Sequence, residues 1–345
     1  MTKRVILLLV AAVLYIGTWA QNAVGQHSTA EEKRPKVGLV LGGGGAKGAA
    51  EVGVLKFIEL ADVKIDYIAG TSIGSIIGAL YSIGYRAADL DSLFHSQEWL
   101  SLLTDRDTGE ASKFISRKDD TLYMFGFPIK KKKNDSPNYT KTLGLSRGES
   151  ITSLFESMIN RPDSIGFDTL PIPFRCVAVD LRNFEEAVLN SGNLPEAMRA
   201  SMSIPGFFKP VCKDSMLLAD GGLLNNLPVD VVRSMGAEKV IAIDLTQNKH
   251  EKRIKKAYSK AEKKQKRNKR TGVKGLLTWV IDRPDLAKYD TNIKDVDVYI
   301  NPDLSGYNAL DFKPSKISKM IRKGEIAGEE ALDELKKLSK SQWYK

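Results

Sequence analysis

The sequence has 345 residues, 42% of them hydrophobic, which is enough for one large α/β domain or two smaller ones with a sizeable core. Its two cysteines exclude a disulfide-scaffolded protein. The formal net charge of +10 is local, because residues 249–270 hold 12 Lys or Arg and only 2 Glu, and the rest of the chain is balanced. The composition therefore indicates a globular protein with one strongly basic segment.

The first 25 residues are typical of a signal peptide. Lys3 and Arg4 form a charged start, an apolar run covers residues 5–20, and small residues over 18–25 offer cleavage sites. The 16-residue run is short for the roughly 20 residues of a bilayer-spanning helix, so an uncleaved anchor is the weaker alternative. We therefore expect an exported protein that is periplasmic, outer-membrane-associated or extracellular.

Two strand–loop–helix units are predicted at the start of the folded part. Residues 37–41 form a short apolar run that ends in glycines, and residues 46–60 then place apolar side chains at helical spacing. Residues 65–69 predict a second strand and residues 73–83 a second helix. If the two strands are parallel neighbours, as βαβ units favour, both loops open at the same edge of the sheet, where α/β proteins build their sites.

The pattern is less regular over residues 87–159, which we expect to form a variable, partly helical cap. Regular signals then return, and they predict strands at 174–180, 186–189, 216–219 and 240–244, with helices at 194–201 and 229–235. The sequence thus predicts an α/β domain with a mostly parallel sheet.

Three further segments complete the predicted organisation. The α/β domain covers residues 36–245, and a basic insertion or linker follows over 246–275. A C-terminal extension covers 276–345, with one more strand at 296–300 and a final amphipathic helix at 317–338.

A glycine-rich loop follows the first predicted strand. Gly43, Gly45 and Gly48 fit the pattern G-x-G-x-x-G, which is a weak signal on its own. In a dinucleotide-binding unit an acidic residue would stand at the end of the second strand, and this chain has none there. A dinucleotide-binding protein is therefore disfavoured, and we expect no cofactor.

The second predicted strand ends instead in Gly-Thr-Ser-Ile-Gly at residues 70–74, a G-x-S-x-G placed between strand and helix as a nucleophile elbow requires. Gly70 and Gly74 remove side-chain bulk around a sharp turn. The helix that follows directs its backbone N–H groups and positive dipole end toward Ser72. Ser72 is therefore the candidate nucleophile.

The glycine loop can then supply an oxyanion hole. Bare amides at Gly43, Gly44 or Gly45 can approach a developing oxyanion without obstruction. The alternative is that both glycine stretches only permit tight turns between strand and helix. The closeness of the two motifs in the sequence favours the catalytic interpretation.

A nucleophilic serine needs a base, and the three histidines are poorly placed for that role. His27 lies beside the leader, His95 follows the second helix, and His250 lies in the basic segment. A carboxylate that acts directly on the serine is the simpler hypothesis, and Asp220 supplies one directly after a predicted strand. Asp180 and Asp244 also follow apolar runs, so position alone does not separate the three.

Four motifs then agree in order: residues 43–48, 70–74, 200–208, and 220–228 with its D-G-G at Asp220, Gly221 and Gly222. Together they resemble the patatin-like phospholipase family, its bacterial members in particular, over about residues 36–245. The resemblance implies a three-layer αβα sandwich, Ser72 as nucleophile and Asp220 as its base. Lys47 stands where the family carries Arg or Lys, so it is a candidate contact to a substrate phosphate, with an ordinary solvated lysine as the alternative.

The basic segment 249–270 suits an anionic lipid surface if it forms a helix, and a solvated insertion is the alternative. Nucleic-acid binding is disfavoured, because the segment has one aromatic residue and the leader exports the chain. The sequence contains no cluster of metal-ligating residues, so we expect no metal. Cys176 and Cys212 lie in apolar stretches, where buried free thiols or one bridge are expected.

The sequence therefore predicts a serine acyl hydrolase that acts on phospholipids or other lipid esters, and it implies neither metal nor cofactor. An unperturbed aspartate base would keep such an enzyme active well below pH 6, since its pKa is about 3.9. A catalytically silent lipid- or membrane-binding module and a short-chain esterase remain as alternatives.

Overall fold

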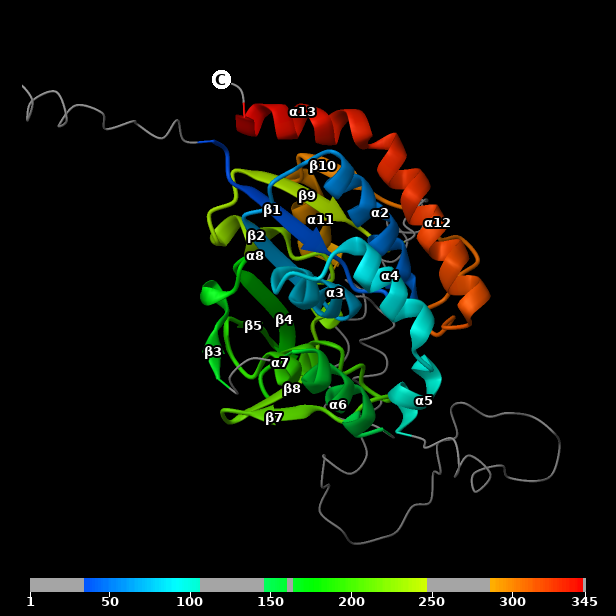
Figure 1. Cartoon of the computed structure of the whole chain (residues 1–345). Coiled ribbons are helices and arrows are strands. Elements are labelled where there is room, and N and C mark those ends of the chain that lie inside the picture. Colours follow the sequence, from blue (N-terminus) through cyan, green and yellow to red (C-terminus); the bar gives the residue numbers. More distant parts are fainter. Residues whose placement is uncertain (1–33, 106–145, 160–163, 247–285, 344–345) are drawn as a thin grey trace, which may run out of the picture.

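The computed structural model describes residues 34–105, 146–159, 164–246 and 286–343 (Figure 1). The predicted signal peptide and the basic segment 249–270 lie outside these residues. Within the described part of the chain, no helix combines the length and the apolar character needed to cross a membrane.

An eight-stranded sheet forms the centre of the molecule, in the order β10-β9-β1-β2-β4-β8-β7, and β5 also pairs with β4. The five strands from β10 to β4 are parallel, whereas β5 and β8 pair antiparallel with β4, and β7 pairs antiparallel with β8. The strands are β1 (Val37–Leu41), β2 (Tyr67–Thr71), β4 (Phe174–Asp180), β5 (Glu185–Leu189), β7 (Val211–Lys213), β8 (Met216–Asp220), β9 (Lys239–Ile243) and β10 (Val298–Ile300). The short strands β3 (Ile165–Gly166) and β6 (Ser191–Gly192) pair separately.

Helices cover both faces of this sheet. They are α2 (Ala49–Leu60), α3 (Ile73–Ser82), α4 (Ala87–Ser96), α5 (Trp99–Thr104), α6 (Glu149–Met158), α7 (Leu194–Ser201), α8 (Val229–Ser234), α11 (Leu286–Lys294), α12 (Pro314–Glu330) and α13 (Leu332–Trp343). Leu39 and Leu41 of β1 pack in the large core with α2 and α3, whereas Val40 packs in a second core with α8 and with Tyr289 of α11. Burial on both faces explains why β1 is a continuous apolar run. The predicted αβα sandwich with a mostly parallel sheet is confirmed.

The final helix differs from its prediction, because the single helix expected over residues 317–338 is broken at Ala331 into α12 and α13. The turn lets α13 run across the top of the molecule (Figure 1). Leu335 and Leu338 stay buried there, and the Gln342 side chain hydrogen-bonds both the amide and the carbonyl of Lys64. The amphipathic pattern continues through the bend, so periodicity could not reveal it.

Helix α12 lies directly against α2. A Cβ at Gly324 would lie 1.9 Å from the carbonyl oxygen of Ala50, and one at Gly53 would lie 2.1 Å from the carbonyl oxygen of Ile321. The two backbones therefore touch, which only glycine permits at these positions. Farther along, Gly328 meets Phe57, so residue numbers rise together along the contact and the helices run parallel.

Strand β4 brings the ends of β2 and β8 together. Because β5 pairs with one edge of β4 over residues 176–180, β2 and β8 must share its other edge. Thr71 at the end of β2 pairs with Val177, and Asp220 at the end of β8 pairs with the next residue, Ala178. The end of β8 therefore meets the turn that follows β2.

The two cysteines are free thiols. Cys176 is buried in β4, as expected, and burial raises its pKa to about 12. Cys212 is exposed, so its expected burial is wrong, because it stands on β7 at the edge of the sheet.

Candidate active site

Ser72 occupies a sharp turn between β2 and α3. Its backbone has φ 55° and ψ −123°, a left-handed conformation that is uncommon for a residue with a side chain and marks local strain. The turn can close because Gly70 has no Cβ, which would lie 2.3 Å from the carbonyl oxygen of Gly74. The G-x-S-x-G motif thus forms the nucleophile-elbow turn, with Ser72 directly before the first turn of α3.

Asp220 is the hydrogen-bond partner of this serine. Ser72 Oγ donates to Asp220 Oδ2 over 2.7 Å, and the amide of Gly222 donates to Asp220 Oδ1 over 2.8 Å. Both side chains are buried. The structure thus brings the predicted pair together, at the place where the ends of β2 and β8 meet along β4.

Burial raises the pKa of Asp220 to about 6, although the hydrogen bonds from Ser72 and Gly222 favour its charged form. The expected activity well below pH 6 assumed an unperturbed carboxyl group, and that assumption is wrong for this site. An aspartate with a pKa near 6 is a stronger base than an exposed one and is still ionised at neutral pH.

The two competing aspartates have other partners. Asp180 Oδ1 accepts the amides of Arg182 and Leu217. Asp244 Oδ2 accepts the hydroxyl groups of Tyr289 and Tyr299. Each of these carboxylates therefore closes a loop or joins two elements, and the structure does not bring them to Ser72.

The glycine loop is held from two sides. The amide of Gly43 donates to the carbonyl of Asn226 over 3.1 Å, and Asn226 Nδ2 donates back to the carbonyl of Gly43 over 3.1 Å. The amide of Ala46 donates to the carbonyl of Ala309 over 2.8 Å. Since the peptide bond between Gly43 and Gly44 is trans, its N–H points opposite to the carbonyl that Asn226 binds, away from Asn226.

Sequence reasoning missed Asn226 and Ala309 as site residues. Asn226 stands inside the motif at 220–228, so its place in that motif was the available signal. Ala309 lies in the C-terminal part of the chain, and its contribution is a backbone carbonyl, which leaves no mark in the sequence.

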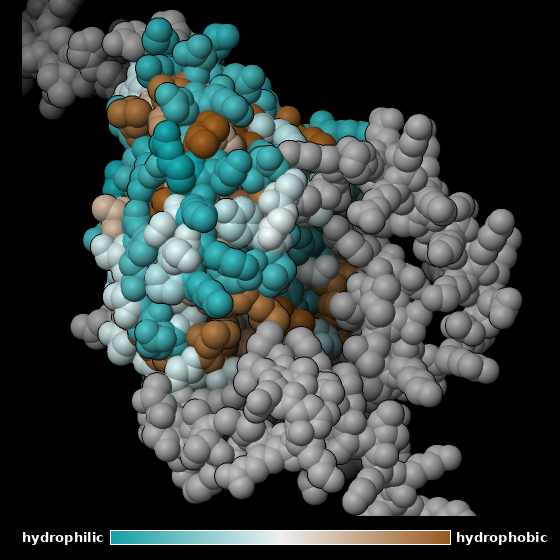
Figure 2. Space-filling view, turned by 90° about the vertical axis from the view of Figure 1, so that its right-hand side faces the viewer, coloured by the Kyte–Doolittle hydropathy of each residue, from teal (hydrophilic) through white to brown (hydrophobic). Residues whose placement is uncertain are grey.

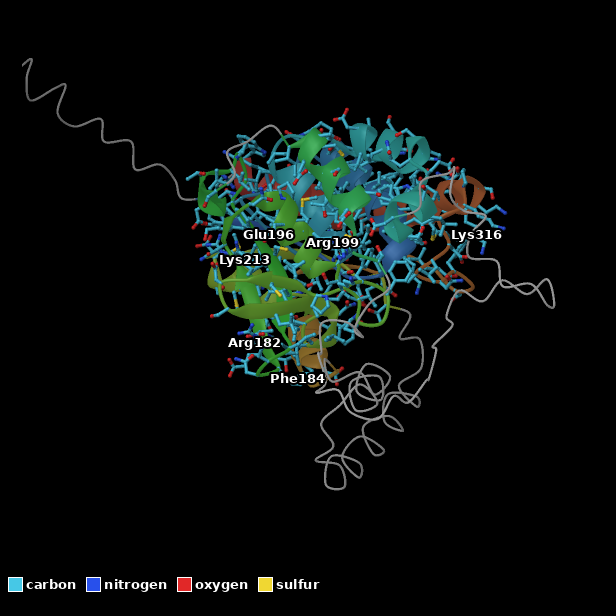
Figure 3. The ribbon with its side chains drawn as sticks, turned by 90° about the horizontal axis from the view of Figure 1, so that it is seen from below. Arg182, Phe184, Glu196, Arg199, Lys213 and Lys316 are labelled. Carbon is cyan, nitrogen blue, oxygen red and sulfur yellow. The ribbon has the colours of Figure 1, made fainter. Side chains whose placement is uncertain are left out.

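The third motif, at residues 200–208, hydrogen-bonds the backbone of Ser72 and of Asp220. Ser201 Oγ accepts the amide of Ser72 over 2.9 Å, and the amide of Asp220 donates to the carbonyl of Ser203 over 3.0 Å. The buried guanidinium of Arg199, which Figure 3 labels, donates to Ser203 Oγ over 2.6 Å and lies over the ring of Phe208. This motif therefore holds both the serine and the aspartate by their backbones.

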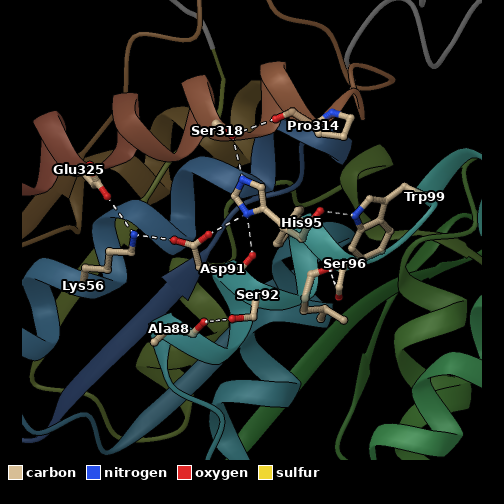
Figure 4. A network of polar contacts seen from close by, with 12 residues as sticks. Lys56, Ala88, Asp91, Ser92, His95, Ser96, Trp99, Pro314, Ser318 and Glu325 are labelled. Carbon is tan, nitrogen blue, oxygen red and sulfur yellow. Dashed lines mark hydrogen bonds and ion pairs between the residues drawn. The ribbon is translucent and has the colours of Figure 1, made fainter.

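His95 has its own partners on the helical layer (Figure 4). Its Nδ1 lies 2.9 Å from Asp91 Oδ1, and its Nε2 lies 2.9 Å from Ser318 Oγ. It thereby links α4 to α12 and is not a base for Ser72. His27 and His250 lie outside the described residues.

The predictions about a metal and about Lys47 concern two further features of the site. In the described ranges, no group of three or more His, Cys, Asp or Glu side chains could hold a metal ion. Lys47 is half-buried in the short turn Gly45–Gly48 between the glycine loop and α2.

Fold and site together define an α/β sandwich protein with a buried serine–aspartate pair at an elbow turn. Residues 39–233 match the family model described as patatin-like phospholipase. Since this match covers more than half of the chain, the protein belongs to the patatin-like phospholipase family.

Two relatives and one solved structure illustrate the similarity. Patatin-like phospholipase domain-containing protein 6 of Mus musculus is 36% identical over 211 residues, which are 61% of this chain and 13% of that protein. Lysophospholipase nte1 of Aspergillus niger is 34% identical over 210 residues, 61% of this chain and 12% of that protein. The chain thus spans only a small part of the length of these relatives. The crystal structure of VipD from Legionella pneumophila has a TM-score of 0.48 and 16% identity, over 88% of this chain and 67% of that one.

Proposed function

We propose that this protein is a serine acyl hydrolase that cleaves fatty acyl esters of phospholipids, with Ser72 as nucleophile and Asp220 as its only base. The observation that carries the proposal is the 2.7 Å hydrogen bond from Ser72 Oγ to the buried Asp220 carboxylate at an elbow turn. This contact gives the serine a proton acceptor without a histidine.

In the first half of the reaction, Ser72 Oγ attacks the ester carbonyl carbon while Asp220 accepts the hydroxyl proton. The oxyanion accepts from the amides of Gly44 or Gly45 in this proposal, since the amide of Gly43 is already bound to the carbonyl of Asn226. The positive end of the α3 dipole adds to this stabilisation. When the tetrahedral intermediate collapses, the lysolipid oxygen leaves with the proton from Asp220, and the acyl group stays on Ser72.

In the second half, water attacks the acyl carbonyl and gives a proton to Asp220. Collapse releases the fatty acid and returns the proton to Ser72 Oγ, which restores the starting state. Since Asp220 must be ionised at the start of each half, its pKa of about 6 suits turnover at neutral pH.

The family and the names of the relatives support a lipid ester as substrate, because they are called phospholipase and lysophospholipase. We propose that a diacyl phospholipid or its lysolipid is cleaved, with Lys47 as the contact to its phosphate. A short-chain esterase would use the same pair on a soluble ester. A catalytically silent lipid-binding module is disfavoured by the hydrogen bond between Ser72 and Asp220.

We also propose export, on the charged and apolar start of the sequence over residues 1–25. Cell fractionation with an antibody to the mature protein tests it, and a processed protein outside the cytoplasm is the expected result. Full-length protein retained in the cytoplasm would reject it.

The test of the activity is release of fatty acid from mixed phospholipid vesicles by the purified protein. Ser72→Ala should lower the rate by about 10⁴-fold or more, and Asp220→Asn by about 10³-fold or more, because they remove the nucleophile and its base. Ser318→Ala is the matched control, because Ser318 contacts His95 and not Asp220. It should leave the rate unchanged.

The outcomes separate the alternatives. Activity on a short-chain ester through Ser72, with no release from vesicles, would keep the mechanism and reject the lipid substrate. Binding to vesicles with no hydrolysis of either substrate would favour the silent module.

A further inference from the structure

Helix α12 begins past the start of α2, on the side of the candidate active site. The helices are parallel, and Ile321 and Gly324 lie against Gly53 and Ala50 in the first turns of α2, so the first turn of α12 precedes this contact. Just before α12, Ala309 touches the glycine loop. The start of α12 therefore lies beside the sheet edge that carries Ser72.

The charges of α12 are separated along its length. Residues 313–323 carry five cations and no acidic residue: Lys313, Lys316, Lys319, Arg322 and Lys323. The stretch over 325–334, which covers the end of α12 and the start of α13, carries five acidic residues and no cation: Glu325, Glu329, Glu330, Asp333 and Glu334. The cationic half is the one beside the site.

This distribution opposes the helix dipole, which favours acidic residues near the N-terminus and cations near the C-terminus. The first turn of α12 has no acidic residue and its last turn has no basic residue. Helix stabilisation therefore does not account for the cations at the start of α12.

Part of this charge is not neutralised by the protein. Lys316 pairs with Asp311, and Arg322 pairs with Glu325. For Lys313, Lys319 and Lys323, no ion pair occurs with any residue in the described ranges. Figure 3 places Lys316 at the rim of the molecule, and Lys313 and Lys319 are exposed.

An apolar side chain stands beside the cations. Trp99 of α5 stacks on Phe312, with ring centroids 5.7 Å apart, which brings α5 to the start of α12. The next residue, Leu100, is 46% exposed. Figure 2, which views the side where α12 lies, shows apolar residues both near the top and in a group lower down, among polar residues. Cations around exposed apolar residues are typical of surfaces that bind lipid bilayers.

We infer that the start of α12, residues 313–323, together with Leu100 of α5, docks the protein on an anionic phospholipid bilayer with the Ser72 edge toward the lipid. The inference rests on the proposed lipid-ester function, because a substrate in the bilayer explains why the cations flank the site. It differs from the prediction for the segment 249–270, which lies outside the described residues.

The test compares two triple variants with the same loss of charge. One changes Lys313, Lys319 and Lys323 to Gln on α12, and the control changes Lys336, Lys337 and Lys340 to Gln on α13. Binding to vesicles of phosphatidylcholine with phosphatidylglycerol, and of phosphatidylcholine alone, is measured by flotation in a Ser72→Ala background. Each lysine at an anionic surface contributes about 1 kcal/mol, so the α12 variant should bind about 100-fold more weakly and the α13 variant far less so.

Hydrolysis of a soluble short-chain ester is measured in parallel, with Ser72 present. Both triple variants should keep the wild-type rate, which shows that they fold. If the wild type hydrolyses neither this ester nor vesicle phospholipid, the proposed function fails, and the binding comparison still decides the docking surface. Equal weakening in the two variants, or no weakening in the α12 variant, overturns the inference.

A probe on the surface gives a second, independent measurement. A nitrobenzoxadiazole label is placed on Ser315→Cys of α12 or on Ser341→Cys of α13, with the exposed Cys212 changed to Ser. Anionic vesicles should shift the emission of the label at 315 to the blue and leave the label at 341 unchanged. A shift at 341 alone would place the docking surface elsewhere.

Discussion

Two serines of the described residues, Ser72 and Ser318, each lie within hydrogen-bond distance of a potential proton acceptor, but their surroundings differ. Ser318 lies 2.9 Å from His95, which lies 2.9 Å from Asp91, so the order of contacts matches a Ser-His-Asp triad. Ser72 has only an aspartate, at 2.7 Å. By residue type alone, the triad at the surface would be the better candidate.

The surroundings reverse that ranking. Ser318 stands within a regular helix, is exposed, and donates its hydroxyl proton to the carbonyl of Pro314 over 3.0 Å. Ser72 stands on a strained turn, is buried, and has the start of α3 behind it and the glycine loop beside it. Nucleophilic catalysis depends on the turn, the burial and the backbone amides more than on the names of the side chains.

The largest expected difference between the two serines is their reaction with a fluorophosphonate. We expect complete modification of Ser72 and none of Ser318, because only the first has a base together with amides for the oxyanion. Mass spectrometry of the digested protein locates the label. Ser72→Ala should abolish labelling and Ser318→Ala should preserve it. Labelled Ser318 in the wild type would refute the contrast.

Removing the charge of Asp220 and removing the charge of Asp91 should change the free energy of unfolding in opposite directions. The folded-state pKa of Asp220 is raised from 3.8 to about 6, so charging it in the fold is costly once the pH exceeds 6, and the cost disappears below 3.8. Two units correspond to about 3 kcal/mol, so Asp220→Asn should raise the free energy of unfolding at pH 8 by up to that amount and hardly at pH 4.

Asp91→Asn serves as the comparison, since it weakens partly exposed contacts to Lys56 and His95. We expect it to lower the free energy of unfolding by about 1 kcal/mol or less. Urea unfolding of both variants at pH 4 and pH 8 gives the values. A loss of stability for Asp220→Asn at pH 8 would show that its burial carries no cost.

The smallest expected effect is the decrease of kcat/KM for ester hydrolysis as the pH falls. Below pH 6 the folded protein protonates Asp220, and kcat/KM on a soluble ester should fall about tenfold per pH unit. His95→Gln should have the same profile as the wild type, because His95 does not contact Ser72. A profile that stays flat to pH 4.5 would mean that Asp220 keeps an ordinary pKa.

Much of the site could be predicted from short motifs, because a tight turn with a nucleophile has strict local requirements. The glycines around Ser72 are dictated by contacts a few residues away, such as that between Gly70 and the carbonyl of Gly74. The strands and helices around the site follow from apolar spacing for the same local reason.

The choice among Asp180, Asp220 and Asp244 could not be predicted from spacing. It depends on strand order, because β8 reverses direction and meets the end of β2 along β4. The contacts of Asn226 and Ala309 with the glycine loop could not be predicted from spacing either, since both residues lie far from the loop in sequence and Ala309 acts through its backbone carbonyl. The bend at Ala331 left no trace, because the amphipathic pattern is the same on both sides of it.

The contact between Ala46 and Ala309 has a consequence for the order of events during synthesis. The glycine loop is translated among the first fifty or so residues of the sequence, yet one of its backbone partners comes from near the other end. Contacts this distant in sequence form late in folding, because the closure of the long loop between them must come first. A nascent chain therefore carries Ser72 long before the last backbone contact of the glycine loop can form.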